Sequence, residues 1–400
     1  MDVAGFVCSM LGTSQCPHES ERIRDRFHEH HFELDRLERS RLHHHRLHDL
    51  RKRQCGRQFD RNDVRSERTL PADDLYLYSC SGGFRRDLIR KHGDPAHHRL
   101  GWGRGWEHRK HVCAVYGYQP GGRRDRGHHA SQAGLKAITL AFLVDGGCVA
   151  TWGGLGGNVN NATFPNGTTV ASAISALEAE GVSVIISWGG ANGSIQSSCT
   201  TASQVQAMYQ SVFNAYPGII GQDFDIEGGI SNSVVAQALA GLKAANPGKL
   251  ISLTLPVLPT GLVSAGISIL DACASAGFNP DVVNVMAMDY GSANDNRAQM
   301  GLDATDAASA TETQIHQAGL SSSVGVTPMI GVNDTNTEIF QLSDASTILN
   351  FAKSNSYITR LTIWSLARDN GGCAGQGFAS ATCSGISQSN FQFSSIFDAF

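Results

Sequence analysis

Residues 221–229, with the sequence GQDFDIEGG, carry acidic side chains at alternate positions: Asp223, Asp225 and Glu227. Alternate residues of a β-strand point to the same face, so a strand here would bring three carboxyl groups together. Like charges at such short range cannot all stay ionised, and at least one group should hold a proton near neutral pH. A proton held in this way is what general acid catalysis requires.

The residues that separate and precede these carboxylates are apolar: Phe224, Ile226, Ile219 and Ile220. In a parallel sheet whose outer face is covered, they would pack against helices. Two other interpretations of the three carboxylates are a solvated acidic edge and a calcium site. The apolar neighbours argue against an exposed edge.

Short apolar runs bounded by Gly, Asn or Pro recur through the second part of the chain. They lie at 137–144, 182–188, 219–227, 249–256, 281–290, 324–331 and 358–366. The segments between them have apolar residues three and four positions apart, which is typical of amphipathic helices, and several begin at Ser, Thr or Asp. This alternation predicts a parallel sheet with right-handed crossovers.

Residues 131–400 have about the length of a (β/α)8 barrel of the TIM type, for which roughly 250 residues are typical. Seven strands are evident, and the segment 111–118 (HVCAVYGY) is the candidate for the first strand. An open doubly wound sheet is the structural alternative. In a barrel, catalytic residues lie at the carboxyl ends of strands. The groups found there are SWGG at 187–190, Glu227, Asp289 with Tyr290, and Trp364 with Ser365.

These four strand ends together resemble glycoside hydrolase family 18, the chitinases, in their bacterial secreted form. SWGG is similar to the S-x-G-G pattern of the family's third strand, and GQDFDIE is similar to the D-G-x-D-x-D-x-E pattern of its fourth. VMAMDYG at 285–291 and LTIWSLARDN at 361–370 resemble its sixth and eighth strands. Two positions depart from the family: Ile220 stands where the first Asp would fall, and Tyr290 is displaced by two positions from the M-x-Y-D pattern.

The resemblance implies endo-acting, retaining hydrolysis of β-1,4-linked N-acetylglucosamine polymers, with Glu227 as the general acid. The nucleophile would be the acetamido carbonyl of the substrate itself, which is a known exception to the scheme of two catalytic carboxylates. Asp225 would hold the acetamido N–H and share a proton with Asp223 and Glu227. The resemblance implies no metal and no organic cofactor.

The same comparison assigns the residues that would contact the substrate. They are Tyr290, Asp289, Trp364, Trp188, Trp152 and Met288. Tyr290 or Asp289 would bind the acetamido oxygen. Trp364 would form the floor of the sugar site, because an aromatic face packs well on the apolar face of a pyranose. Trp188 and Trp152 would flank the cleft.

Two other functions fit the same motifs. One is an endo-β-N-acetylglucosaminidase acting on N-glycan cores, and the other is a chitin-binding lectin that kept the cleft but lost turnover. Glu227 argues against the lectin, because lectins of this family typically lack that acid. Each motif also has a structural interpretation, with Trp364 as core, SWGG as a tight turn and Asp289 as a helix cap, but none of these explains all four strand ends.

The cysteines of residues 131–400 fit an exported protein. Cys373 and Cys383 bracket a short polar loop after the last predicted strand and are expected to form a disulfide, and Cys148 and Cys199 lie in neighbouring loops and are a second candidate pair. Cys273, inside a predicted helix, is expected to be a buried thiol. The resemblance implies an extracellular monomer that binds chitin or chitooligosaccharides and no nucleic acid. The sequence contains no apolar run of the length that a membrane span needs.

Residues 1–130 form an Arg- and His-rich segment for which we predict no globular fold. They hold 22 Arg and 3 Lys against 18 acidic residues, a formal charge of +7, whereas residues 131–400 hold 3 Arg and 4 Lys against 18, a charge of −11. They also contain 15 of the 16 histidines. A nucleic-acid-binding arm or a zinc or nickel tract would be functional interpretations, but the segment has neither ordered ligand spacing nor a nucleic-acid-binding motif.

Our hypothesis is that residues 1 to about 129 are an out-of-frame translation. Arg and His stop abruptly before SQAGLKAITLAF at 131–142, and the opening MDVAGFVCSMLG lacks the basic start and cleavage site of a signal peptide. If so, the first strand would be damaged and an unpaired gap would remain between the second and eighth strands. Translating the upstream DNA in the other two frames tests the idea.

Overall fold

The computed structural model describes residues 80–81, 111–116, 135, 137–291 and 299–400. The chain separates into two units, Met1–Thr69 and Leu70–Phe400, and every described residue belongs to the second. The prediction of no globular fold for the Arg- and His-rich segment 1–130 falls outside the described residues except at 80–81 and 111–116. No helix among the described residues combines the length and hydrophobicity that crossing a bilayer requires.

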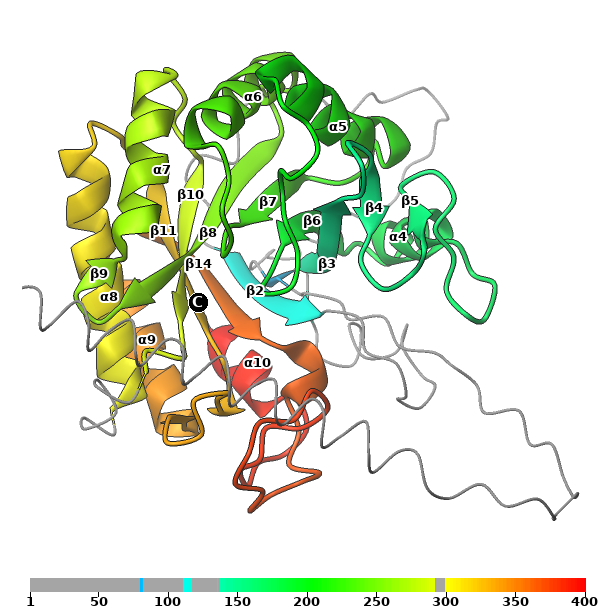
Figure 1. Cartoon of the computed structure of the whole chain (residues 1–400). Coiled ribbons are helices and arrows are strands. Elements are labelled where there is room, and N and C mark those ends of the chain that lie inside the picture. The colour runs from blue at the N-terminus through cyan, green and yellow to red at the C-terminus, as the bar shows by residue number, and fades with distance from the viewer. Residues whose placement is uncertain (1–79, 82–110, 117–134, 136, 292–298) are drawn as a thin grey trace, which may run out of the picture. The chain divides into compact units, whose positions relative to one another are not determined.

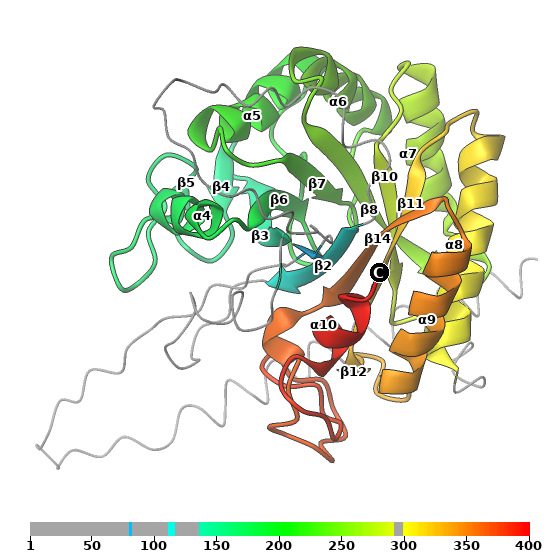
Figure 2. The same cartoon turned by 180° about the vertical axis from the view of Figure 1, so that it is seen from behind.

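Strands and helices alternate along the second unit, and the helices lie around the outside of the strands (Figures 1 and 2). The strands are β1 (Cys80–Ser81), β2 (His111–Tyr116), β3 (Ala137–Asp145), β4 (Ala150–Trp152), β5 (Gly157–Asn158), β6 (Ser183–Gly189), β7 (Gly221–Asp225), β8 (Leu250–Leu258), β9 (Gly261–Leu262), β10 (Val282–Ala287), β11 (Ser323–Pro328), β12 (Gly331–Val332), β13 (Ile339–Phe340) and β14 (Ile358–Trp364). The helices are α4 (Val170–Ala179), α5 (Ala202–Ala215), α6 (Asn232–Ala245), α7 (Ser264–Ser275), α8 (Met300–Gln317), α9 (Leu342–Ser354), the short 3-10 helix η2 (Leu366–Arg368) and α10 (Gln392–Phe397).

The seven strands predicted from the sequence are all present and all pair in parallel. Their order across the sheet is β14, β11, β10, β8, β7, β6, β3. The α/β class with a parallel sheet is therefore confirmed. The candidate first strand, 111–118, contains β2, which pairs in parallel with β14 and with β3 at residues 115–116, and β1 pairs antiparallel with β2 and β3.

The two faces of the sheet carry different side chains. On the outer face, Trp188 of β6 and Phe224 of β7 stack with ring centroids 6.3 Å apart, and both pack against Tyr209 of α5. All three are fully buried. The outward packing expected of Phe224 is therefore confirmed. On the inner face, the buried residues of the same strands include the polar Ser187, Asp223 and Asp225.

Both candidate disulfides are present. Cys148 pairs with Cys199 and Cys373 pairs with Cys383, with Cα–Cα distances of 4.9 and 5.8 Å. Cys273 of α7 is a buried free thiol, as expected, and burial raises its pKa to about 12. It stays a thiol at neutral pH and takes no part in disulfide exchange.

Candidate active site

A cavity of about 760 Å³ opens at the carboxyl ends of the parallel strands. Asp223, Asp225 and Glu227 all line it, together with residues from β3, β8, β10, β11 and β14. The strand that carries these carboxyl groups, β7, ends at Asp225, which is earlier than the sequence suggested. Glu227 lies just beyond its end. The three carboxyl groups nevertheless face one cavity, as their alternate spacing predicted.

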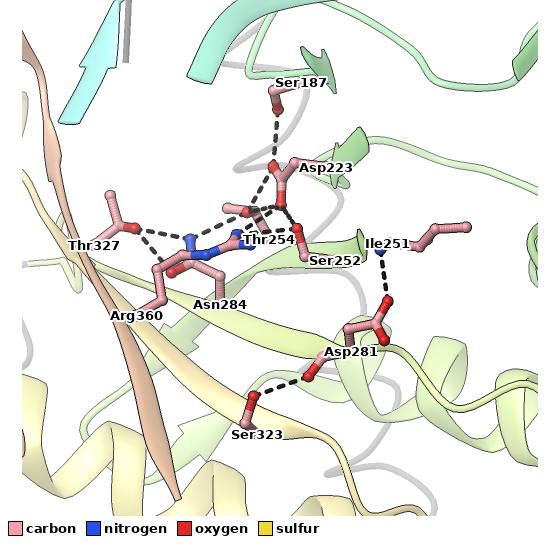
Figure 3. Close-up of polar contacts among 10 residues, drawn as sticks. All are labelled: Ser187, Asp223, Ile251, Ser252, Thr254, Asp281, Asn284, Ser323, Thr327 and Arg360. Carbon is pink, nitrogen blue, oxygen red and sulfur yellow. Dashed lines mark hydrogen bonds and ion pairs between the residues drawn. The ribbon is translucent and has the colours of Figure 1, made fainter. Parts of the chain in front are cut away.

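Asp223 lies deepest and is surrounded by hydroxyl groups, as Figure 3 shows. Its Oδ2 accepts hydrogen bonds from Ser187 Oγ at 2.9 Å and Thr254 Oγ1 at 2.9 Å, and its Oδ1 accepts from Ser252 Oγ at 2.5 Å. The Nη1 atom of Arg360 lies 3.6 Å from Oδ1. Three hydroxyl donors and one nearby cation thus hold the Asp223 carboxylate in a fixed position.

Asp225 and Glu227 lie in a different electrostatic environment. Burial raises the pKa of Asp225 well above its usual range, and the charges of Glu227 and Asp223 and the hydrogen bond from Glu227 add to this. Burial also raises the pKa of Glu227, opposed by its hydrogen bond with Asp225 and reinforced by the charge of Asp289. Both shifts favour the protonated form, so the environment of the pair Asp225–Glu227 favours a bound proton.

The SWGG segment places its residues on opposite faces of β6. Ser187 points inward to Asp223, whereas Gly189 and Gly190 have positive φ angles of 92° and 76°. A Cβ atom on Gly189 would lie 2.0 Å from the carbonyl oxygen of Asp225, and one on Gly190 would lie 2.7 Å from the ring of Phe142. The two glycines therefore permit the close packing on which the shape of the cavity depends.

Trp364 lines the cavity, as predicted for the floor of a sugar site. Its ring stacks on that of Phe142 from β3, with centroids 5.9 Å apart and an angle of 24° between the planes. Sequence reasoning missed Phe142. Its signal was weak, because it sits in an apolar strand and its ring is recognisable as a site residue only beside Trp364.

The groups after β10 are only partly as predicted. Met288 and Asp289 line the cavity, and Asp289 Oδ1 accepts a hydrogen bond from the backbone N–H of Thr335 at 2.7 Å. Tyr290 is buried and is not among the residues that line the cavity, and its backbone N–H donates to Glu338 Oε2 at 3.1 Å. Of the two alternatives, Asp289 therefore lines the cavity and Tyr290 does not. The physical reason is that β10 ends at Ala287 and Asp289 adopts a positive φ of 51°, so strand alternation no longer applies.

Trp188 and Trp152 do not flank the cleft, so both predictions are corrected. Trp188 is fully buried on the outer face, and its indole Nε1–H donates to Gln222 Oε1 at 2.7 Å. Trp152 is buried at 1% exposure and donates to the hydroxyl of Tyr216 at 2.9 Å. Because Ser187 points inward, its neighbour Trp188 must point outward.

Several polar residues of the inner face were missed by sequence reasoning. They are Thr139, Ser252, Thr254, Asn284, Thr327, Arg360 and Thr362. All are buried, and each occupies an inward position of an otherwise apolar strand. Polar residues at alternate positions, as in the segments LISLTLP and ITRLTIW, were the available signal. Among the described residues, no group of three or more His, Cys, Asp or Glu is placed to hold a metal ion.

Comparisons with known proteins agree with this geometry. No protein-family model matches the chain. It is 34% identical over 267 residues to a probable bifunctional chitinase/lysozyme of Escherichia coli, and 34% identical over 264 residues to endochitinase 11 of Metarhizium anisopliae. Each match covers 60% of this chain, and the matches span 29% and 49% of the two relatives.

Solved structures give the same result. The catalytic domain of the hyperthermophilic chitinase from Pyrococcus furiosus matches with a TM-score of 0.59 and 29% identity. The match covers 69% of this chain and 89% of the other. The chain therefore contains a segment that resembles chitinase catalytic domains in both sequence and fold, which confirms the family 18 resemblance of its motifs.

Proposed function

We propose that this protein is a chitinase that cleaves β-1,4 linkages between N-acetylglucosamine residues from within the polymer, with retention of configuration. One observation carries the proposal: Asp223, Asp225, Glu227 and Trp364 line a single cavity at the carboxyl ends of the strands. The relatives named chitinase and endochitinase support the choice of substrate. A cavity of this size is typical of small-molecule sites and suits a few sugar rings.

In this mechanism Glu227 is the general acid. Its raised pKa keeps a proton available for the glycosidic oxygen at a pH where an ordinary glutamate would be ionised. As that proton is transferred and the C–O bond breaks, the acetamido oxygen of the same sugar bonds to C1 and forms an oxazolinium. Water then attacks C1 from the side opposite the acetamido oxygen and gives its proton to Glu227, which restores the acid. The bond between C1 and the acetamido oxygen breaks in this step, which regenerates the acetamido group with retention at C1.

Asp225 has the position and the protonation that the acetamido group needs. It lies between Asp223 and Glu227 in the sequence and lines the same cavity, so it can accept the acetamido N–H as the oxazolinium forms. Asp289 is proposed to bind the acetamido oxygen, with Met288 in apolar contact beside it. Trp364, stacked on Phe142, offers an aromatic face to the sugar ring.

We further propose that the parallel strands close into a (β/α)8 barrel, with β2 as the first strand. The pairing of β2 with β14 on one side and with β3 on the other supports closure. The two disulfides support an extracellular location. The protein is proposed to act there as a monomer on chitin or chitooligosaccharides, without a cofactor.

The proposal is tested by measuring release of N,N′-diacetylchitobiose from soluble chitin oligomers by the parent and by Glu227→Gln. We expect the variant to bind oligomers but to lose activity by roughly 10²–10⁴-fold, the usual contribution of a general acid. Glu312→Gln is the matched control, because Glu312 is on α8 and pairs with His316 outside the cavity. NMR of the first product formed tests retention, because a retaining enzyme releases the β-anomer from a β-linked substrate.

Two outcomes would contradict the proposal and identify the alternative. Binding of oligomers without any release by the folded parent would indicate a lectin. Cleavage of N-glycan cores with no action on chitin oligomers would indicate an endo-β-N-acetylglucosaminidase. Equal activity of Glu227→Gln and the parent would remove Glu227 from its role.

A further inference from the structure

Arg360 is a buried cation inside the parallel sheet that the proposed reaction does not use. It lies in the middle of β14 and is only 5% exposed. Its Nη1 donates to Ser252 Oγ of β8 at 3.0 Å and lies 3.6 Å from Asp223 Oδ1 of β7 (Figure 3). Two strands, β11 and β10, separate β14 from β8 in the sheet. The side chain therefore reaches across the interior instead of contacting only its neighbouring strand.

Gly325 provides the room for this crossing. It lies on β11, paired with Asn284 of β10 on one side and with Arg360 on the other. A Cβ atom at this position would lie 2.6 Å from Asn284 Oδ1 and 3.3 Å from Arg360 Cβ. Any side chain at position 325 would displace one of these two residues, so the missing side chain is part of the arrangement.

The chemistry of the donors fixes the direction of the hydrogen bonds. An arginine has only donors, so the hydroxyl of Ser252 must accept from Arg360, which leaves its single proton for Asp223. The hydroxyl of Thr254 likewise accepts from Asn284 Nδ2 at 3.1 Å and donates to Asp223. Each of these two hydroxyl groups already accepts a hydrogen bond from another donor. Its own proton is therefore directed toward Asp223.

Asp225 lacks this support. Its Oδ1 is buried and has no hydrogen-bond partner among the described residues. Of these two neighbouring aspartates, only Asp223 forms an ion pair with Arg360. Asp223 and Asp225 therefore differ in their hydrogen-bond and ion-pair partners, and Arg360 contributes to this difference through its contacts with Ser252 and Asp223.

We propose that Arg360 is a positioning residue for the reaction: by directing hydroxyl protons onto Asp223, it confines the transferable proton to Asp225 and Glu227. The inference rests on the proposed function, because it assigns the source of the proton that Glu227 delivers. The charged groups that face this network are Asp223, Asp225 and Glu227, together with Asp289, Asp281, Asp334 and Arg368.

The test is the pH dependence of kcat/KM on a soluble chitin oligomer for the parent, Arg360→Met and Arg360→Lys. Without the nearby positive charge the carboxyl groups release protons less readily, so both limbs of the profile should move to higher pH by about one unit in Arg360→Met. We expect kcat/KM at the optimum to fall on the order of 10²-fold. Arg360→Lys keeps the charge, so its limbs should stay near those of the parent.

Lys243→Met is the matched control, since it also removes a cation that contacts an aspartate. Lys243 Nζ lies 2.8 Å from Asp281, and Lys243 is on α6 outside the cavity. Both limbs of the pH profile of Lys243→Met should therefore coincide with those of the parent. If Arg360→Met lowers kcat/KM by the same factor at every pH, Arg360 is only structural and the inference is overturned. If Arg360→Met does not fold, Ser252→Ala removes the hydroxyl through which Arg360 acts on Asp223, and unmoved limbs there overturn the inference equally.

A direct measurement separates this inference from the proposed function. If the folded parent releases no sugar, the proposed function fails, but the proton distribution can still be followed by carboxyl-carbon NMR on protein labelled with ¹³C-aspartate. An aspartate carbon that titrates at higher pH in Arg360→Met than in the parent supports the inference. Identical titration of all aspartate carbons in the two proteins contradicts it.

Discussion

Asp225 is a buried acid whose protonation affects the stability of the folded protein. Because its pKa is raised in the folded protein, the folded state binds this proton more tightly than the unfolded state does. The corresponding stability is fully present below the pKa of the unfolded state and is lost as the pH rises through the pKa of the folded state. At neutral pH the protein thus either retains a proton or buries a charge at this position.

Asp225→Asn should therefore be more stable than the parent, by an amount that grows with pH. The amide cannot ionise, so we expect a gain in Tm on the order of 2–4 °C for each 1 kcal/mol of relief at neutral pH, and almost no gain in acid. Thermal unfolding across the pH range measures this. The control is Asp271→Asn, an exposed position of α7. Parallel Tm curves for Asp225→Asn and the parent would contradict the argument.

At the residue scale, strand alternation predicted some positions and was not applied to others. It correctly placed Asp223 and Asp225 on one face of β7, and Glu227, just beyond the strand, lines the same cavity. The same rule places Ser187 inward and Trp188 outward, although the SWGG motif suggested Trp188 as a substrate contact. It also marks Arg360 of β14 as an inward residue. Asp289 and Tyr290 lie beyond the end of β10, where the conformation of a turn cannot be read from alternation.

At the element scale, two loops that rim the cavity are joined beyond the ends of their strands. The carboxylate of Asp145, at the end of β3, accepts hydrogen bonds from the backbone N–H groups of Cys148, Ser197, Ser198 and Cys199. Burial alone would raise the pKa of Asp145, but these four donors outweigh it, and the pKa is lowered. The Cys148–Cys199 disulfide links the same two loops.

Removing the two disulfides separately should destabilise the protein unequally. The Cys148–Cys199 bond spans a sequence separation of 51 and the Cys373–Cys383 bond one of 10. Chain entropy predicts a loss of about 4 kcal/mol for the first and about 3 kcal/mol for the second. Tm values of the paired Cys→Ser variants, each the control for the other, measure the difference. A larger loss for the shorter loop would show that native contacts, not chain entropy, dominate.

The elements themselves were largely predictable. Apolar runs between turn residues located the parallel strands, and cap residues located the helix starts, as at Thr201, whose side chain and Gln204 form a capping box. Strand ends were less predictable, since β7 stops at Asp225 although the alternating pattern continues to Glu227. The ends are set by contacts of the following loops, which depend on residues far away in the sequence.

At the scale of the whole molecule, the chain divides into two units that also differ in composition. The break in charge predicted a boundary near residue 130, whereas β2 lies before it and belongs to the parallel sheet. The sequence anticipated this strand only as a candidate, because the strand is short and stands within an Arg- and His-rich region. Whether residues 1–129 are an out-of-frame translation stays a hypothesis that the DNA sequence decides.

Two deletions distinguish the contributions of the first 116 residues. Removing residues 1–69 should leave Tm and oligomer cleavage unchanged, because these residues form a separate unit. Removing residues 1–116 takes away β2 and leaves the edges of β14 and β3 unpaired, which should cause aggregation. Size-exclusion chromatography and thermal unfolding measure both. Soluble, monomeric protein after the longer deletion would contradict the role given to β2.

The missing side chain at Gly325 has a consequence for how this protein can change. A methyl group there would lie 2.6 Å from Asn284 Oδ1 and 3.3 Å from Arg360 Cβ. Shortening the side chain at 360 leaves its Cβ in place, so a substitution at 325 becomes tolerable only once Asn284 has been replaced by a smaller residue. The reverse order is open, because shortening Asn284 requires no prior change at 325. Positions 325 and 284 are thus epistatic in one direction. A lineage that filled position 325 would find the return to asparagine at position 284 sterically closed.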